Sequence, residues 1–356
     1  MATNQVRNIS HWQEMKHLHS GGTRNKKILL DENGDLFYFK ESYNNENGKF
    51  YKYEFYSEII ASYIGEMIGL EVLQYEIAIY KTQIGCLSKS MISNIDEELI
   101  EGGKYLKAFD NSFILEDEKP KEKYTYQLIL DALNHFNLTD ISKTKMIEML
   151  LFDAIIGNSD RHQENWGYIA VNTSSLDAFR ELTNISNGKE TMLPKWATKL
   201  LRSSFFLKRL RSKEQKNEFV KTKLKLDRNL RFSPIYDSGC CLGREIEEER
   251  IIKMIQNESQ IDKYISKGMA EIHWEGVKLS HFEILKKLFD MDNNLKERSK
   301  NIIEKFNIND LSNFMLQIDI NLPTEFNNWE ISNYRKDFIV KLLTLRKEKI
   351  QQIINE

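Results

Sequence analysis

The stretch that most constrains this chain is a polar segment at residues 157–167, which is enclosed by two hydrophobic runs. The preceding run, residues 146–156, has apolar side chains at helical spacing. Gly157 and Asn158 follow it, and these residue types can end a helix in the left-handed conformation. Residues 168–171, Tyr-Ile-Ala-Val, have the composition of a strand. A segment this polar cannot be an ordinary part of a core, so the sequence predicts a catalytic loop between a helix and a strand.

Asp160 and Asn165 lie five positions apart in this loop. The spacing lets the aspartate face an acceptor hydroxyl while the asparagine amide oxygen reaches a metal ion, as phosphoryl transfer requires. Two roles stay open for Arg161: a contact with the transferring phosphoryl group, and an ion pair that ties the loop to an acidic neighbour. His162 is predicted to be a structural hydrogen-bonding residue, because Asp160 already occupies the position of the base.

Length and composition set outer limits. With 356 residues, 41% apolar and 29% charged, the chain is globular and forms one two-lobed domain or two domains. The net charge of −2 gives no overall attraction to nucleic acid or membranes. Cys86, Cys240 and Cys241 form neither a disulfide framework nor a zinc pattern, which predicts a reducing compartment. A polar start and the lack of a long apolar run predict a cytoplasmic protein with no transmembrane segment, with export by a specialised secretion system left open.

The amino-terminal part begins with a predicted β-hairpin, because strand-like residues 26–31 and 35–40 are joined through Asn33-Gly34. The segment before the hairpin has paired glycines, whose backbone N–H groups could approach an anion closely. Its predicted nucleotide-contacting residues are Ser20, Gly21, Gly22 and Thr23. Lys40 ends the second strand and is either a solvated edge residue or the cation that holds the α- and β-phosphates of ATP.

Residues 52–67 follow as a helical pattern with a broad apolar face. In a nucleotide-binding lobe the strand lysine needs a carboxylate to orient it. Glu58 is the predicted partner of Lys40, and Glu54, one turn earlier, is the alternative.

Residues 72–80 and 84–87 are predicted to complete a small antiparallel sheet against this helix. The chain then crosses into a second lobe. Ser90 and Met91 belong to this crossing, where an adenine ring would find backbone partners.

The second part of the chain is predicted to be mainly helical, at residues 124–136, at 143–156 and in several stretches between 245 and 354. The predicted fold class is therefore α+β and bilobal. A small lobe of antiparallel sheet plus one helix takes residues 1–91, and a large, mostly helical lobe takes residues 92–356.

An insertion at residues 172–232 separates the loop strand from the next polar motif. From Lys199 to Arg231 it contains twelve Lys or Arg residues against three acidic ones. This basic segment is either a solvated surface or a docking site for an acidic protein, a nucleic acid such as tRNA, or an anionic lipid head group.

The insertion ends at a second polar motif, in which Asp237 is followed two positions later by Gly239. An acidic residue at a strand end before such a turn can bind Mg²⁺. Asp160, His162 and Asp237 could instead be ligands in a metallohydrolase, but the other histidines fall in no ligand spacing. A Ser/His/Asp hydrolase would need a Gly-x-Ser-x-Gly elbow, which the sequence lacks.

The two polar motifs resemble those of the HipA-like kinases, a bacterial serine/threonine protein kinase family of toxin and effector proteins. The resemblance is carried by residues 157–165, Gly-Asn-Ser-Asp-Arg-His-x-x-Asn, and by residues 234–239, Pro-x-Tyr-Asp-x-Gly. It implies a protein-kinase-like fold, the use of ATP and Mg²⁺, and transfer of phosphate to a Ser or Thr hydroxyl of a protein.

The resemblance also implies roles for individual residues. Asp160 would be the catalytic aspartate, Asn165 and Asp237 would hold Mg²⁺, and Lys40 would contact ATP. Family members can autophosphorylate a serine in the glycine-rich loop, which makes Ser20, and also Thr23, candidate sites.

Two features of the sequence depart from the family pattern, and two alternative functions are also open. The glycine-rich segment starts near residue 20, which indicates a short form that lacks the amino-terminal subdomain of the longest members, and the insertion is longer than usual.

The Asp-Arg-His-x-x-Asn loop also resembles phosphatidylinositol kinases, although Tyr-Asp-Ser-Gly stands where those have Asp-Phe-Gly. A non-catalytic nucleotide-binding module is the other alternative, but none of the four residues whose loss would mark it is lost: Lys40, Asp160, Asn165 and Asp237.

Overall fold

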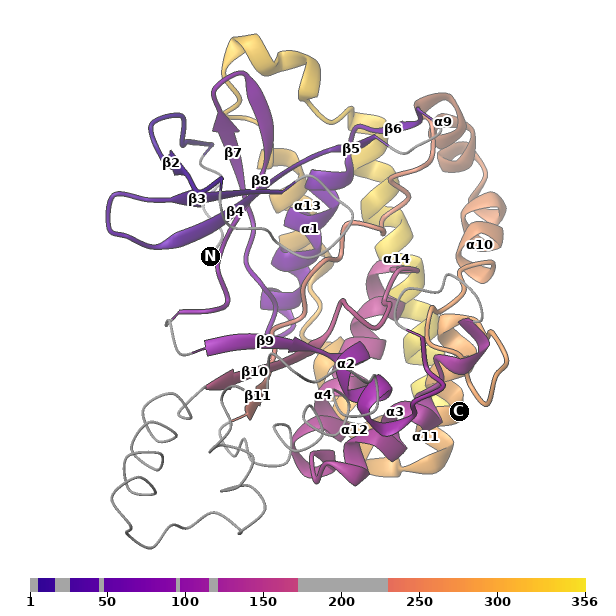
Figure 1. The fold of residues 1–356 in the computed structure, drawn as a ribbon. Coiled ribbons are helices and arrows are strands. Elements are labelled where there is room, and N and C mark those ends of the chain that lie inside the picture. The colour runs from indigo at the N-terminus through magenta and orange to yellow at the C-terminus, as the bar shows by residue number, and fades with distance from the viewer. Residues whose placement is uncertain (1–5, 17–25, 45–47, 94–96, 115–120, 172–229) are drawn as a thin grey trace, which may run out of the picture.

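The structure is a computed structural model, and it describes residues 6–16, 26–44, 48–93, 97–114, 121–171 and 230–356 (Figure 1). Its amino-terminal part is a six-stranded sheet in the order β1-β7-β8-β4-β3-β2. The strands are β1 (Arg7–Asn8), β2 (Gln13–Glu14), β3 (Lys26–Leu30), β4 (Leu36–Glu41), β7 (Glu76–Tyr80) and β8 (Gln83–Lys89). A separate two-stranded ribbon pairs β5 (Tyr43–Asn44) with β6 (Phe50–Tyr51).

The predicted hairpin is confirmed, since β3 and β4 pair from Lys26↔Lys40 to Leu30↔Leu36. The second hairpin is also present, but its first strand begins at Glu76 rather than at residue 72. The sequence predicts an antiparallel sheet, and every pairing in it is antiparallel except that of β1 with β7, which is parallel. A two-residue strand is too short to show an alternating pattern, so this exception is not visible in the sequence.

The two faces of the six-stranded sheet have different neighbours. Phe37 and Phe39 of β4 lie in a small core on one face. Successive strand residues point to opposite faces, so Lys40 points to the other face, toward α1 (Glu54–Met67). On its far side α1 packs against α13 (Ile308–Gln317), where the rings of Tyr63 and Phe314 stack with centroids 3.8 Å apart. Because α1 is enclosed on both sides, its Glu54 and Glu58 are buried, whereas Glu66 is exposed.

The carboxyl-terminal part consists of a three-stranded sheet and a group of helices. The sheet has the order β11-β10-β9 and is formed by β9 (Glu97–Glu101), β10 (Gly167–Val171) and β11 (Leu230–Phe232). The helices are α2 (Gly102–Phe109), α3 (Tyr126–His135), α4 (Thr139–Ile156), α9 (Glu248–Gln256), α10 (Glu258–Ser266), α11 (His281–Met291), α12 (Asn293–Glu304), α13 and α14 (Asn333–Asn355). Short 3₁₀ helices lie at Lys121–Lys123 and Thr324–Trp329.

The predicted helices at 124–136 and 143–156 are confirmed as α3 and α4, and α4 begins earlier, at Thr139. Helix α2 is not predicted by the sequence pattern because two glycines open it, and glycine disfavours helices. The reason for the first glycine is tertiary. A Cβ on Gly102 would lie 2.3 Å from the ring of Trp166, so only glycine allows α2 to start against the catalytic loop. The α+β, bilobal fold class is thus confirmed.

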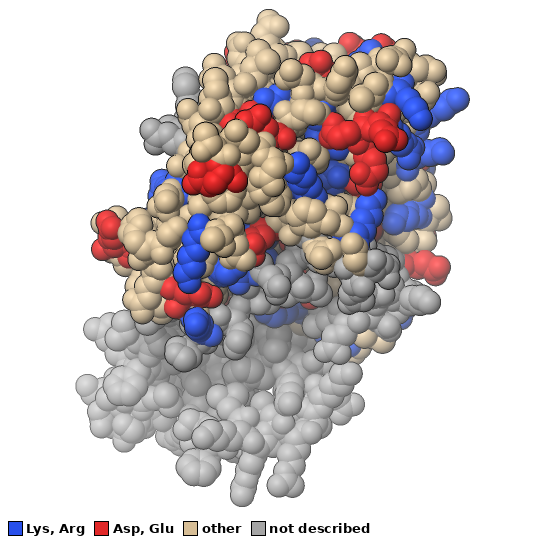
Figure 2. Space-filling model, turned by 90° about the horizontal axis from the view of Figure 1, so that it is seen from above, with Lys and Arg blue, Asp and Glu red and all other residues tan. Residues whose placement is uncertain are grey.

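Two observations concern membranes and surface charge. Among the described residues, no helix has both the length and the apolar content needed to cross a bilayer. The face seen in Figure 2 carries basic and acidic side chains side by side. The described part of this face is therefore not a surface of one charge sign.

Candidate functional site

The catalytic loop begins where α4 ends. Gly157 adopts the left-handed conformation (φ 72°), and its N–H donates to the carbonyl of Asp153 at 2.8 Å. The side-chain amide of Asn158 donates to the Asp153 carboxylate at 3.0 Å. Both predicted helix-ending residues therefore turn the chain out of α4, and β10 follows at Gly167.

The pairing of β10 with β11 brings the two polar motifs together across 72 positions of sequence. The strands are antiparallel, with Tyr168 opposite Phe232, so residues that precede β10 lie beside residues that follow β11. The N–H of Ser233 continues the pairing by donating to the carbonyl of Gly167 at 2.9 Å. The hydroxyl of Tyr236 donates to the carbonyl of Glu164 at 2.6 Å and fixes the second motif on the loop.

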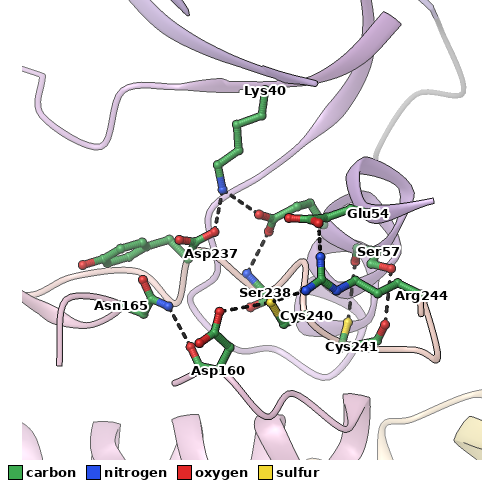
Figure 3. A network of polar contacts seen from close by, with 12 residues as sticks. Lys40, Glu54, Ser57, Asp160, Asn165, Asp237, Ser238, Cys240, Cys241 and Arg244 are labelled. Carbon is green, nitrogen blue, oxygen red and sulfur yellow. Dashed lines mark hydrogen bonds and ion pairs between the residues drawn. The ribbon is translucent and has the colours of Figure 1, made fainter. Parts of the chain in front are cut away.

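Lys40 meets two carboxylates from different parts of the chain (Figure 3). Its Nζ lies 2.7 Å from Glu58 Oε1 of α1 and 2.6 Å from Asp237 Oδ1. Burial lowers the pKa of Lys40, but the charges of Asp237 and Glu58 outweigh it and hold the pKa well above its ordinary value. Lys40 is thus a buried cation and not a solvated edge residue, and its glutamate partner is Glu58. Glu54 pairs with Arg244 instead.

The turn at Asp237 is held close to α1. Asp237 has φ 54°, a conformation that is uncommon for residues other than glycine and costs on the order of 1 kcal/mol. The N–H of Ser238 donates to Glu58 Oε2 at 2.8 Å. A Cβ on Gly239 would lie 3.1 Å from Glu54 Cγ and 3.3 Å from Glu58 Oε1, so a glycine permits this approach. Glu58 therefore orients both the lysine and the aspartate turn.

The oxygen donors near this turn fit a hard cation. Asn165 is buried, and its amide nitrogen donates to the backbone carbonyl of Asp160 at 2.7 Å. In this orientation the amide oxygen is the atom that can coordinate a metal ion, and Asp237 supplies a carboxylate. Within the described ranges no three His, Cys, Asp or Glu side chains form a metal-binding group. A small set of protein oxygens completed by phosphates and water is the arrangement that Mg²⁺ favours.

Asp160 has a neighbour that the sequence pattern does not indicate. Its Oδ2 lies 3.0 Å from the Sγ of Cys240, and its backbone N–H donates to Asn158 Oδ1 at 3.3 Å. Cys240 in turn lies 3.0 Å from Nη2 of Arg244. No local motif marks these two residues, because their significance arises only when the second polar motif folds onto the loop.

The side chain of Arg161 is fully buried. Its guanidinium pairs with the carboxylate of Asp153, with Nη2 at 2.8 Å and Nε at 3.0 Å from its two oxygens. Nη1 also donates to the carbonyls of Asn165 and Tyr236, at 3.0 and 2.6 Å. Of the two roles left open for Arg161, this geometry favours the ion pair that ties the loop to an acidic neighbour.

His162 takes part in the loop through both its side chain and its backbone. Its Nδ1 accepts from the N–H of Glu164 at 3.3 Å, and its carbonyl accepts from the N–H of Asn165 at 2.9 Å. These contacts are those of a residue that shapes the loop.

The remaining predicted contacts lie at the edges of the site. Ser20, Gly21, Gly22 and Thr23 fall outside the described residues, as does the basic segment apart from its last two positions, 230 and 231. At the crossing, the N–H of Ser90 donates to the carbonyl of Leu36 at 2.8 Å, and the carbonyl of Met91 accepts from Arg231 at 3.1 Å. One backbone group of each residue predicted to contact adenine thus has a protein partner.

Comparison with known proteins places this site in context. No protein-family model matches the chain. A curated relative, the serine/threonine-protein kinase CtkA of Helicobacter pylori, is 28% identical over 158 residues, which are 43% of this chain and 47% of the relative. The aligned region thus spans about half the length of that relative.

Solved structures resemble the chain over nearly its whole length. The crystal structure of the Helicobacter pylori proinflammatory kinase CtkA superposes with a TM-score of 0.66 at 17% identity, covering 98% of this chain and 97% of that one. The chain is similar to a serine/threonine-protein kinase in sequence and in fold. Shewanella oneidensis HipA, in a complex with HipB and operator DNA, gives a TM-score of 0.46 at 11% identity, with 95% of this chain and 67% of that one covered. The similarity to CtkA confirms the predicted resemblance to a bacterial serine/threonine protein kinase and the predicted kinase-like fold.

Proposed function

We propose that this chain is a protein serine/threonine kinase that uses ATP and Mg²⁺. The observation that supports the proposal most is the meeting of Lys40, Glu58 and Asp237, which come from β4, α1 and the turn after β11. A phosphate-binding cation, its orienting carboxylate and a metal-binding carboxylate are the parts that positioning of ATP requires.

In the proposed reaction each residue has a separate task. Bound Mg²⁺-ATP supplies the phosphoryl group and the positive charge that neutralises its oxygens. Lys40 binds phosphate oxygens and is kept in place by Glu58. Asn165 and Asp237 would hold the metal, and Asp160 would accept the proton of the incoming Ser or Thr hydroxyl. Most of the catalytic effect would come from orientation and charge, so the rigid contacts of the loop matter as much as the reacting groups.

Lys40 has two carboxylates within 2.7 Å, and only one of them is needed to orient it. A phosphate oxygen that takes the place of Asp237 beside Lys40 would leave the Asp237 carboxylate to the metal. The register Lys26↔Lys40 also supports phosphate binding here, because Lys26 follows the predicted glycine-rich segment, residues 20–23, by only three positions in the sequence. Autophosphorylation at Ser20 or Thr23, and a role as a bacterial toxin or effector, remain predictions from the resemblance.

The test is phosphate transfer by purified protein with labelled ATP and Mg²⁺, offered generic proteins and inositol lipids. Transfer to protein, or a mass increase of the intact chain by one phosphate, is expected, and Asp160→Asn should remove it. Asp290→Asn, an exposed aspartate on α11, is the matched control and should behave as wild type. Transfer to lipid alone would favour a lipid kinase, and a wild type no more active than Asp160→Asn would contradict the proposal.

A further inference from the structure

Cys240 joins the carboxylate of Asp160 to a guanidinium. Its Sγ lies 3.0 Å from Asp160 Oδ2 and 3.0 Å from Arg244 Nη2 (Figure 3). A thiol can donate one hydrogen bond and accept another, so Cys240 can donate to the carboxylate while it accepts from the arginine. The reaction proposed above gives this thiol no role, although it touches the residue assigned as the base.

Arg244 is held by α1. Its Nη1 pairs with the carboxylate of Glu54, and its guanidinium lies over the ring of Tyr51, 4.4 Å from the centroid. Because the guanidinium is planar and its nitrogens form a rigid fork, fixing one side on Glu54 fixes the direction of the other side toward Cys240. The three contacts form a chain from α1 to Asp160.

Glu54 and Glu58 are one helical turn apart, so they lie on the same side of α1. Glu58 holds Lys40 on the phosphate side of the site, and Glu54 reaches the acceptor side through Arg244 and Cys240. A shift of α1 would therefore move the groups on both sides of the site together. In a proposed kinase this matters, since transfer needs the phosphate and the acceptor hydroxyl aligned at the same time.

We propose that Cys240 and Arg244 are positioning residues for phosphoryl transfer. They link the position of α1 to the orientation of the Asp160 carboxylate. Cys240 acts on the Asp160 carboxylate and Arg244 acts through Cys240, and neither is assigned a contact with ATP or with the acceptor hydroxyl. The inference rests on the proposed function.

The test is a double-mutant cycle of Cys240→Ala and Arg244→Gln, read as kcat and as KM for ATP. Each single change should lower kcat about tenfold and leave the KM for ATP within about twofold. The double variant should have nearly the kcat of either single variant, because both changes break the same chain of contacts. Cys240→Ser should keep kcat within about threefold of wild type, because a hydroxyl also donates to a carboxylate. Melting temperatures confirm that the variants are folded.

Two matched controls separate this role from general damage. Cys241→Ala removes the neighbouring thiol, whose contact is with the carbonyl of Ser57 at 4.0 Å and not with Asp160. Arg250→Gln removes an exposed arginine. Both should keep the kcat of wild type. Wild-type kcat in folded Cys240→Ala, additive effects in the cycle, or equal losses in kcat and in ATP affinity would overturn the inference alone. A wild type that transfers phosphate to no acceptor would overturn the proposed function and the inference together.

Discussion

Two buried ion networks adjoin the catalytic loop, and they differ in what surrounds the cation. The loop network is Arg161 with Asp153, and the lobe network is Lys40 with Glu58 and Asp237. In both, burial lowers the pKa of the cation and the nearby carboxylates outweigh that effect and raise it. Arg161 also donates to two backbone carbonyls and to Ser238, whereas among the described residues the Lys40 ammonium donates to carboxylates alone.

The surroundings of the two cations indicate which buried pair is a structural support and which can exchange partners. The contacts of Arg161 run to both polar motifs, so the loop network joins the loop to the Asp237 turn. The lobe network joins a strand, a helix and a turn, and one of its carboxylates is surplus for orienting the lysine. A buried charge that loses its only partner is costly, but one that keeps a second partner is not.

The sharpest test of this contrast is Asp237→Asn. We expect kcat to fall about a thousandfold, the size of effect that loss of a key electrostatic contact produces. The free energy of unfolding should change by less than about 1 kcal/mol, because Lys40 keeps Glu58. Initial rates and urea unfolding measure the two quantities. A loss of several kcal/mol in stability would show that both carboxylates are structural and would remove the distinction between the networks.

The counterpart is Arg161→Met, which should act mainly on folding. It leaves the Asp153 carboxylate buried without its cation, and such a change costs about 3–5 kcal/mol of unfolding free energy. Urea unfolding measures it, with exposed Arg250→Met as the control, which should stay within about 0.5 kcal/mol of wild type. The double variant Asp153→Leu/Arg161→Met should recover part of the loss, because no unpaired charge remains. Unchanged stability in the single variant would mean that the loop network is not a support.

The lobe network should also respond to nucleotide, and the loop network should not. At a concentration about 100 times its Kd, Mg²⁺-ADP should raise the free energy of unfolding of wild type by about 2.7 kcal/mol. Lys40→Met should lose most of this increment, because the phosphates lose their cation. Thermal unfolding with and without nucleotide measures it. An equal increment in wild type and Lys40→Met would contradict phosphate binding by Lys40.

The sequence predicts those parts of the molecule that local patterns specify. The loop at 157–167 and the hairpin at Asn33-Gly34 follow from glycine and polar residues between periodic runs, and both are present. The choice of Glu58 over Glu54 as the partner of Lys40 agrees with the geometry. Helical spacing alone could not decide it, since residues one turn apart share a face.

The rest depends on how segments of the chain fold onto one another. Nothing near Arg161 in the sequence reveals Asp153 as its partner, because the pairing requires the loop to fold back on α4. Cys240 and Arg244 gain their contacts only when the turn after β11 lies against α1. Helix α2 starts at a glycine because a side chain there would clash with the ring of Trp166, and this contact also exists only in the folded chain.

A smaller effect extends the comparison to a buried basic group that has no carboxylate partner among the described residues. His281, at the start of α11, is buried, and among the described residues its Nε2 has no hydrogen-bond partner. Burial, and then the charges of Arg346 and Lys278, lower the pKa of His281 well below its ordinary value. The folded protein therefore keeps this histidine neutral at a pH where the unfolded chain protonates it.

It follows that stability should decrease as the pH falls below about 6.5, the unfolded pKa, because the unfolded state then binds an extra proton. The contribution of His281 is at most about 1.4 kcal/mol per pH unit. Urea unfolding of wild type and His281→Gln from pH 7.5 to pH 5 measures the difference in slope, and His135→Gln, at an exposed histidine of α3, should keep the wild-type slope. Equal slopes in wild type and His281→Gln would mean that this histidine finds a partner when protonated. His281 would then not differ from the paired cations Lys40 and Arg161 in having no partner for its charge.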